Sequence, residues 1–250
     1  MVNFFRKIRY SFFLEGKTGK YLKYAFGEIL LVVIGILIAV YINTNREESL
    51  QKQYTISVFE QIRNDLINDS IKLSDDIQKI VTNNQLIVDM LNDRLPESFY
   101  ANINETTYDD PDVRPIRSLC TDFVNFLPNT KGHELLKSLN SRDLVNDSLT
   151  NEIMRYYSQL ETALPEYNKV TIEVSKKNIQ EYKQYTWFEN WALGIYDPQF
   201  VKYLKEDPDN RKRLAEFYTY SSVNETYWKT LRQTTQELIS RIEQEVKLSQ

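Results

Sequence analysis

Glycine is scarce in this chain, which has six glycines among its 250 residues. Four of them lie at or before Gly35, so only Gly132 and Gly194 serve the rest of the sequence. Tight β-hairpins and phosphate-cradling loops both depend on glycine, because glycine adopts positive φ angles without strain. We therefore do not expect the long segment after Gly35 to form a sheet-rich or a nucleotide-binding domain.

Cysteine and histidine each occur once, as Cys120 and His133. A single cysteine excludes an intrachain disulfide and a cysteine metal framework, and we expect this thiol to be buried rather than paired between chains. A single histidine excludes a zinc site with two histidines and leaves a Ser-His-Asp mechanism dependent on that one residue. We therefore expect His133 to cap or pack a helix, and we predict a protein that is not an enzyme and has no metal and no cofactor.

Two patterns that are typical of ligand sites are incomplete in this sequence. The acidic runs at residues 109–112 and 207–209 lack the glycine turn of a calcium loop, and Arg211 stands where a ligand is needed. The segment 16–18 (GKT) lacks the glycine that a P-loop has five positions before its Gly-Lys pair. Solvated turns, helix caps and a flexible link explain these segments.

A long apolar run, residues 29–42 (ILLVVIGILIAVYI), contains no charged or amide side chain. With its flanks it extends over residues 24–43, and such a helix of about twenty residues spans the hydrocarbon core of about 30 Å. Tyrosines at positions 21, 24 and 41 lie where interfacial aromatic residues are expected. A cleaved signal peptide is the competing interpretation, but the basic region is long for one and no small-x-small cleavage pattern follows Ala39. We therefore predict an uncleaved signal anchor.

Charge predicts the orientation of this span. Residues 1–23 carry six basic residues and one acid, whereas residues 43–63 carry three of each. The positive-inside rule then assigns residues 1–23 to the cytoplasm as a basic amphipathic segment, residues 24–43 to the transmembrane helix and residues 44–250 to the periplasm as a helical-bundle domain. Of the chain's 31 basic and 35 acidic residues, residues 43–250 hold 25 and 33, an acidic balance that argues against nucleic acid as a partner.

Apolar periodicity predicts helices throughout the outer domain. One helix is expected from residue 46 to residue 95, continuous with the span and stopped by Pro96, with lapses in its apolar stripe at Asp69 or Ser70 and at Asn84. A loop at 96–118, a short helix at 133–140, a helix from about 149 to 185 that Pro165 kinks or divides, and a last helix from 208 follow. The predicted fold is all-α, with one N-terminal transmembrane helix continuous with an elongated antiparallel helical bundle joined by short connectors.

The N-terminal segment is amphipathic. Three basic residues fall on one side of a helix and five apolar residues on the other, the pattern of an in-plane helix on an anionic leaflet. A packing surface for a partner protein is the alternative. The predicted membrane-surface residues are Phe4, Phe5, Arg6, Lys7, Ile8, Arg9, Phe12 and Phe13.

One face of the predicted span combines an acid with small residues. At intervals of four, three, four and four, its members share one side of a helix and include a small-x-x-x-small pair that allows close helix approach. The acid either snorkels to the inner interface beside Lys20 or Lys23, lies in a helix–helix contact, or belongs to an ion or proton path. We predict a helix–helix interface on this face, formed by Glu28, Val32, Gly35, Ala39 and Asn43.

Two segments resemble a known family. FFRKIR followed by GKTGKYLKYAFGEILLVVIGILIAVYIN is similar to the N-terminal signature of an uncharacterised family of bacterial single-span membrane proteins, and FLPNTKGHELLKSLNSRDLVNDSLTNEIMRYYSQL is similar to its middle region. The chain departs from the family pattern at Ser141, where a glycine is expected, and at Tyr41, which replaces a polar residue. The resemblance implies an inner-membrane location and a helical outer domain, and it supplies no catalytic residues.

Two functional classes follow from these observations. The first is a membrane-anchored periplasmic scaffold or accessory subunit of an envelope complex, a homo-oligomer or a partner of other envelope proteins, that associates through the span and contacts membrane lipid. The second is a periplasmic ligand-sensing bundle, which would need a separate signalling partner because about 23 residues are expected in the cytoplasm. The sequence favours the scaffold.

Overall fold

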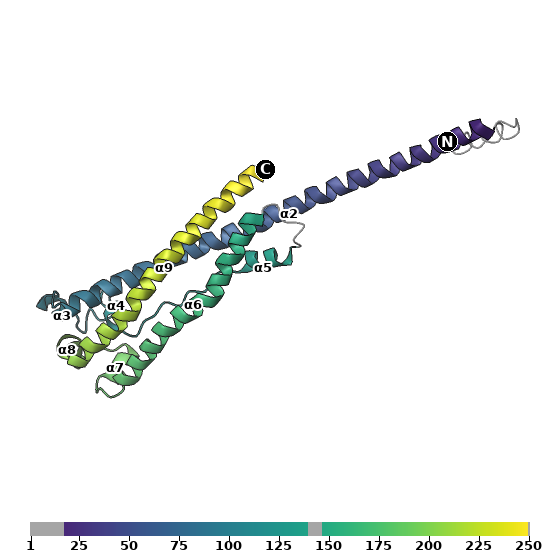
Figure 1. Cartoon of the computed structure of the whole chain (residues 1–250). Coiled ribbons are helices and arrows are strands. Elements are labelled where there is room, and N and C mark those ends of the chain that lie inside the picture. Colours follow the sequence, from purple (N-terminus) through teal and green to yellow (C-terminus); the bar gives the residue numbers. More distant parts are fainter. Residues whose placement is uncertain (1–17, 140–146, 250) are drawn as a thin grey trace. The chain divides into compact units, whose positions relative to one another are not determined.

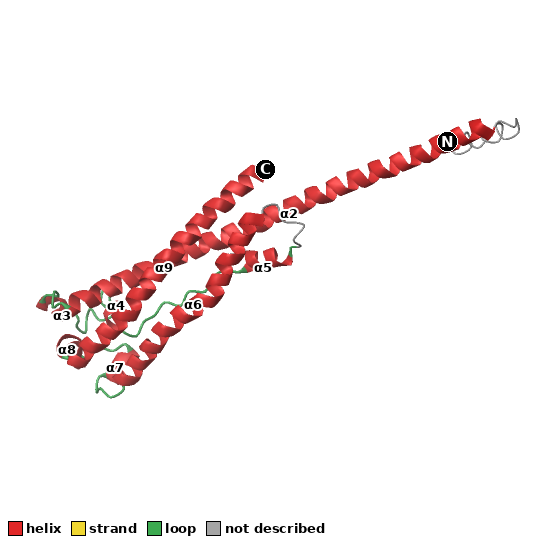
Figure 2. Cartoon of the chain, viewed as in Figure 1, coloured by secondary structure: helices red, strands yellow, loops and turns green. Residues whose placement is uncertain are grey.

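The computed structural model describes residues 18–139 and 147–249. All regular elements in this part of the chain are helices, and no strand occurs there (Figure 2). The predicted all-α fold is therefore confirmed. The helices are α2 (Thr18–Leu91), α3 (Glu97–Ala101), α4 (Arg114–Arg117), α5 (Lys131–Ser138), α6 (Asp147–Tyr182), α7 (Phe188–Leu193), α8 (Pro198–Glu206) and α9 (Pro208–Ser249).

Helix α2 contains both the predicted span and the first helix of the outer domain. Its 74 residues have neither glycine nor proline after Gly35, so nothing in the local sequence breaks the backbone hydrogen bonding. The predicted continuity of the two segments is confirmed. The helix ends at Leu91, a few residues before the expected stop at Pro96, and Asp93 then adopts a positive φ of 53°.

Two compact units make up the chain, divided in α2 between Thr55 and Ile56. The described part of the first unit is the N-terminal portion of α2. It is the one helix in the described residues that is long and apolar enough to cross a membrane, with a mean hydropathy of 2.6 in its most apolar window and no buried residue in that window. This supports, in a coarse way, the prediction of a single-pass membrane protein.

In the second unit, polar contacts fix the directions of α2 and α9. Arg63 pairs with Glu243 at 2.6 Å, and the Asn84 amide donates to Glu225 at 2.7 Å. Residue numbers that rise along α2 are therefore paired with residue numbers that fall along α9. The two helices are antiparallel.

Helix α6 is also antiparallel to α9 and lies beside it (Figure 1). Arg241 of α9 pairs with Glu152 near the start of α6, and Glu216 of α9 pairs with Lys177 near its end at 2.8 Å. Because α2 and α6 both oppose α9, they run in the same direction. The chain must therefore travel back between them, and the short connector expected between antiparallel neighbours is replaced by a long return through α3, α4 and residues 118–130.

Residues 118–130, which we call the return segment, have an irregular backbone apart from a turn at their start. The segment nevertheless enters the core, because Cys120 and Phe126 are 2% and 0% exposed and Phe126 packs edge-on against Trp228 of α9 at 5.6 Å between ring centroids. The predicted burial of the lone cysteine is confirmed. Burial of this apolar surface stabilises the fold by roughly 25 cal/mol for each Å² removed from water.

In the sequence, an aspartate followed by a proline at 197–198 and again at 207–208 is the pattern of a helix N-cap with proline in the first helical position, and α8 and α9 begin there. Asp197 accepts a hydrogen bond from the Gln199 amide at 2.8 Å and caps α8, and Asp207 accepts one from the Asp209 amide at 2.8 Å at the start of α9. Pro165 lies inside α6 without dividing it. At the end of α2, Arg211 donates to the carbonyl oxygens of Met90 and Leu91, which have no partner within the helix.

Gly132, in the first turn of α5, provides a stability test. A Cβ at this position would lie 2.6 Å from Cγ1 of Ile62 and 2.6 Å from the Ile62 backbone nitrogen. Because main chain cannot move as a side-chain tip can, we expect Gly132→Ala to lower the free energy of unfolding by about 1–3 kcal/mol. Urea unfolding of the full chain in detergent measures this loss.

Two variants control that experiment. Ser138→Ala, at an exposed position of the same short helix, should change stability by less than about 0.5 kcal/mol. Adding Ile62→Ala to Gly132→Ala should not restore stability, since the backbone contact remains. A double variant as stable as Ile62→Ala alone would show that α5 does not approach α2 this closely.

Candidate functional site

The return segment is held by side chains because its backbone has no strand partner. From α2, Asp65 accepts from the Gly132 amide at 2.7 Å, and Asp69 accepts from the Asn129 amide at 3.1 Å and from the Asn129 side chain at 2.6 Å. Carboxylates thus take the backbone donors at the end of the segment. Both aspartates are buried, Asp69 to 1% exposure.

Asparagines of α6 take the carbonyl groups. Asn168 donates its side-chain amide to the Phe126 carbonyl at 3.2 Å, and Asn178 donates to the Cys120 carbonyl at 2.9 Å. An unpaired buried backbone group costs roughly 1–3 kcal/mol, so these bonds are what allow the segment to lie in the core.

Burial sets the protonation behaviour of Asp69. Desolvation raises the pKa of its carboxyl group to about 6, and the two hydrogen bonds from Asn129 oppose that rise by favouring the charged form. Desolvation also raises the pKa of the Cys120 thiol to about 12. The cysteine is therefore protonated at neutral pH and is a weak nucleophile.

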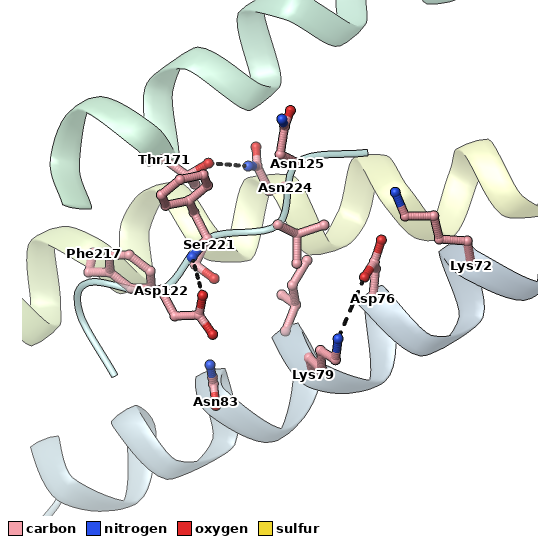
Figure 3. Close-up of a pocket in the computed structure, with 13 residues that line it drawn as sticks. Lys72, Asp76, Lys79, Asn83, Asp122, Asn125, Thr171, Phe217, Ser221 and Asn224 are labelled. Carbon is pink, nitrogen blue, oxygen red and sulfur yellow. Dashed lines mark hydrogen bonds and ion pairs between the residues drawn. The ribbon is translucent and has the colours of Figure 1, made fainter. Parts of the chain in front are cut away.

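Beside the return segment lies a cavity of about 150 Å³ within the second unit (Figure 3). Three helices and an irregular stretch contribute to it, since α2, α6, α9 and the return segment each supply lining residues. The residues that line it are Lys72, Asp76, Lys79, Ile80, Asn83, Asp122, Phe123, Val124, Asn125, Thr171, Phe217, Ser221 and Asn224.

The inner surface of the cavity is polar. Asp76, Thr171, Ser221 and Asn224 are all at most 8% exposed. Within the part of the chain that the structure describes, the buried Asp76 Oδ2 has no hydrogen-bond partner. The Asn224 amide nitrogen donates to the Tyr167 carbonyl at 3.1 Å and to Thr171 Oγ1 at 3.3 Å, which leaves the Asn224 side-chain oxygen as an acceptor.

The rim of the cavity is charged, and its wall is partly apolar. Lys72 and Lys79 are exposed, and Lys79 Nζ lies 4.0 Å from Asp76 Oδ1. Desolvation raises the pKa of Asp76, and the two lysines oppose that rise. Ile80 and Phe217 supply apolar surface, and Asp122 lies at the rim with Oδ1 accepting from the Phe123 amide at 2.9 Å.

His133 is packed, as the sequence predicted. Its ring is 2% exposed and stacks on the Tyr157 ring with a centroid separation of 4.2 Å. Desolvation lowers the pKa of His133, so the ring is neutral at pH 7. Neither ring nitrogen has a hydrogen-bond partner in the described residues, and His133 does not line the cavity.

Of the two sets of residues predicted to act at the membrane, one lies in α2 and the other lies outside the described residues. Glu28, Val32, Gly35, Ala39 and Asn43 form part of the exposed N-terminal portion of α2, where no atom lies within 4 Å of a Cβ built on Gly35. Their helical spacing gives them one face, as predicted. The predicted membrane-surface residues, from Phe4 to Phe13, lie outside the described residues.

Sequence analysis missed the cavity residues, although signals were present. Ser221 interrupts the apolar face of α9, and Asn224 follows three residues later on the same side of the helix. Asp76 occupies a buried position of α2 one turn before Ile80. The sequence signal for such residues is a polar side chain at a position where the helical spacing calls for an apolar one. The lapse at Asp69 in the apolar stripe of α2 is a signal of the same kind.

Comparison with protein families, with curated proteins and with solved structures gave no match for this chain. The functional argument therefore depends on the residues and geometry described above.

The raised pKa of Asp69 predicts a pH dependence of stability. Between about pH 4 and pH 6 the folded state holds a proton that the unfolded state has released, so stability falls as the pH rises through this window. Relative to Asp69→Asn, which keeps the shape but does not titrate, the wild-type free energy of unfolding should fall by about 1–3 kcal/mol between pH 4 and pH 7. Urea unfolding of the full chain at a series of pH values measures the difference.

Asp75→Asn is the matched control, because Asp75 is an exposed carboxylate of the same helix. Its pH profile should follow that of the wild type. A wild-type advantage over Asp69→Asn that grows as the pH rises would contradict a carboxylate whose desolvation outweighs its hydrogen bonds from Asn129.

Proposed function

We propose that this protein is a membrane-anchored periplasmic scaffold or accessory subunit of a bacterial envelope complex, without enzymatic activity, and that it self-associates through its span. The observation that carries the proposal is the N-terminal portion of α2, whose most apolar window has no buried residue. An apolar helix that the protein itself does not cover needs lipid or another helix around it.

Charge and resemblance support the location. The basic excess before the span favours an inner-membrane protein with its N-terminus in the cytoplasm and residues 44–250 in the periplasm. The similarity to the family of bacterial single-span proteins, stated above, favours the same location. The acidic outer region favours protein partners over nucleic acid.

The face formed by Glu28, Val32, Gly35, Ala39 and Asn43 is the proposed contact between spans. Gly35 has open space around its α-carbon, so a second helix can approach the backbone there. Contact with a partner also removes the Glu28 carboxyl from lipid, where an acid is unfavourable.

Cysteine crosslinking in membranes tests this contact. In a Cys120→Ala background, Gly35→Cys and Ala39→Cys should each form a disulfide-linked dimer on mild oxidation, because small-residue interfaces bring the helix backbones close together. Leu31→Cys and Leu37→Cys are the matched controls in the same span and should remain monomeric. Equal crosslinking at all four positions would show random collision in place of a defined face.

Protease treatment of intact spheroplasts tests the orientation. We expect digestion of residues 44–250 without lysis, because the positive-inside rule assigns them to the outer side. A tag at the N-terminus should be protected until the membrane is opened. Protection of the C-terminal region with digestion of the N-terminal tag would reverse the proposed topology.

A second candidate function is ligand sensing by the outer domain. The specific observation that favours it is the cavity whose lining includes the buried Asp76 Oδ2, which has no hydrogen-bond partner in the described residues, since packing alone does not require an unpartnered carboxylate oxygen there. Such a sensor would act through a separate signalling partner.

A further inference from the structure

The inner surface of the cavity is rich in hydrogen-bond acceptors. Asp76 is 8% exposed, and within the described residues its buried Oδ2 has no donor. Ser221 and Asn224 line the same cavity, and their side-chain oxygens can also accept hydrogen bonds. A buried carboxylate oxygen without a donor is unfavourable by several kcal/mol. A group that completes this part of the cavity must donate a hydrogen bond to Asp76, and a primary ammonium does so while its charge also complements the carboxylate.

The rim has the opposite character. Lys72 lies one turn before Asp76 and Lys79 one turn after it on the same face of α2, and both lysines are exposed (Figure 3). Asp122, also at the rim, has one carboxylate oxygen occupied by the Phe123 amide. Two ammonium groups at the mouth fit a ligand carboxylate, since a charge-assisted hydrogen bond is about twice as strong as a neutral one.

Volume limits the ligand. A cavity of about 150 Å³ is the size that holds a molecule such as benzene, so a ligand has roughly six to eight heavy atoms. Ile80, Val124 and Phe217 give one side of the cavity an apolar surface for a short aliphatic group. An ammonium, a carboxylate and a short aliphatic group within that size are the parts of a small α-amino acid.

We propose that this cavity is a binding site for a small zwitterion of the α-amino acid class, with the ammonium toward Asp76, Ser221 and Asn224 and the carboxylate toward Lys72 and Lys79. The inference goes beyond the scaffold role and gives the second candidate function a ligand class. It is independent of the span, so crosslinking at Gly35 and Ala39 and ligand binding can fail separately.

Titration calorimetry on the full-length protein in lipid nanodiscs tests the proposed ligand class with three small molecules. L-alanine carries both charges, ethylamine lacks the carboxylate and propionate lacks the ammonium. We expect L-alanine to bind with a dissociation constant below about 1 mM and the other two to bind at least about tenfold more weakly. Absence of heat from L-alanine at about 10 mM overturns the proposal, and ethylamine binding equal to that of L-alanine overturns the zwitterion assignment.

Variants locate the site. Asp76→Asn should weaken L-alanine binding at least about tenfold, because it removes the charge that faces the ammonium. Asp75→Asn, the neighbouring exposed carboxylate, should bind as the wild type does. Unchanged binding by Asp76→Asn would place the L-alanine site elsewhere and overturn the proposal.

A second variant keeps the test decisive where Asp76→Asn alters folding. Ser221→Leu adds side-chain volume inside an existing cavity, because Ser221 is 5% exposed and lines that cavity. Binding of L-alanine should be lost while circular dichroism and the unfolding midpoint stay close to those of the wild type. A folded Ser221→Leu protein that still binds L-alanine contradicts the site.

Discussion

Every feature of the helical unit depends on satisfying the backbone of the return segment. An irregular chain inside a helix bundle has amide and carbonyl groups that neither a helix nor a sheet can bond, and each unpaired group costs roughly 1–3 kcal/mol. Asp65 and Asp69 of α2 take the donors, while Asn168 and Asn178 of α6 supply donors to the carbonyls. With these four side chains in place, α2 and α6 can run in the same direction although they are joined by one chain.

The cavity is a consequence of that arrangement. A helix with its side chains is about 10–12 Å across. The return segment is a single irregular stretch of chain, which is much thinner and cannot fill the space that a fourth helix would occupy. Residues 122–125 of the return segment therefore form only one wall, and polar side chains of α2 and α9 remain uncovered next to them. Asp76 Oδ2, which lies among them, has no hydrogen-bond partner in the described residues.

Helix periodicity and helix ends were readable from the sequence, because local propensity and apolar spacing determine them. The continuity of α2, the caps at Asp197 and Asp207 and the packing of His133 are examples. The return of residues 118–130 through the core was not readable, since its partners are side chains more than forty positions away in the sequence. The apolar stripe of α2 lapses at Asp69 and Asn84, and each of these residues forms a hydrogen bond with a segment distant in the sequence.

Helix α2 carries polar residues at two kinds of position where stability alone disfavours them. An acid within an apolar span is unfavourable toward lipid, and a carboxylate at a buried position of a bundle is unfavourable unless donors surround it. Asp65 has a backbone donor from the first turn of α5 and Asp69 has donors from the return segment, so a structural role accounts for both. Asp76 Oδ2 has none from the described protein, and Lys79 approaches only the other oxygen, at 4.0 Å. Hydrogen bonds within the protein therefore account for Asp65 and Asp69, whereas the second carboxylate oxygen of Asp76 is the group around which we propose the ligand site.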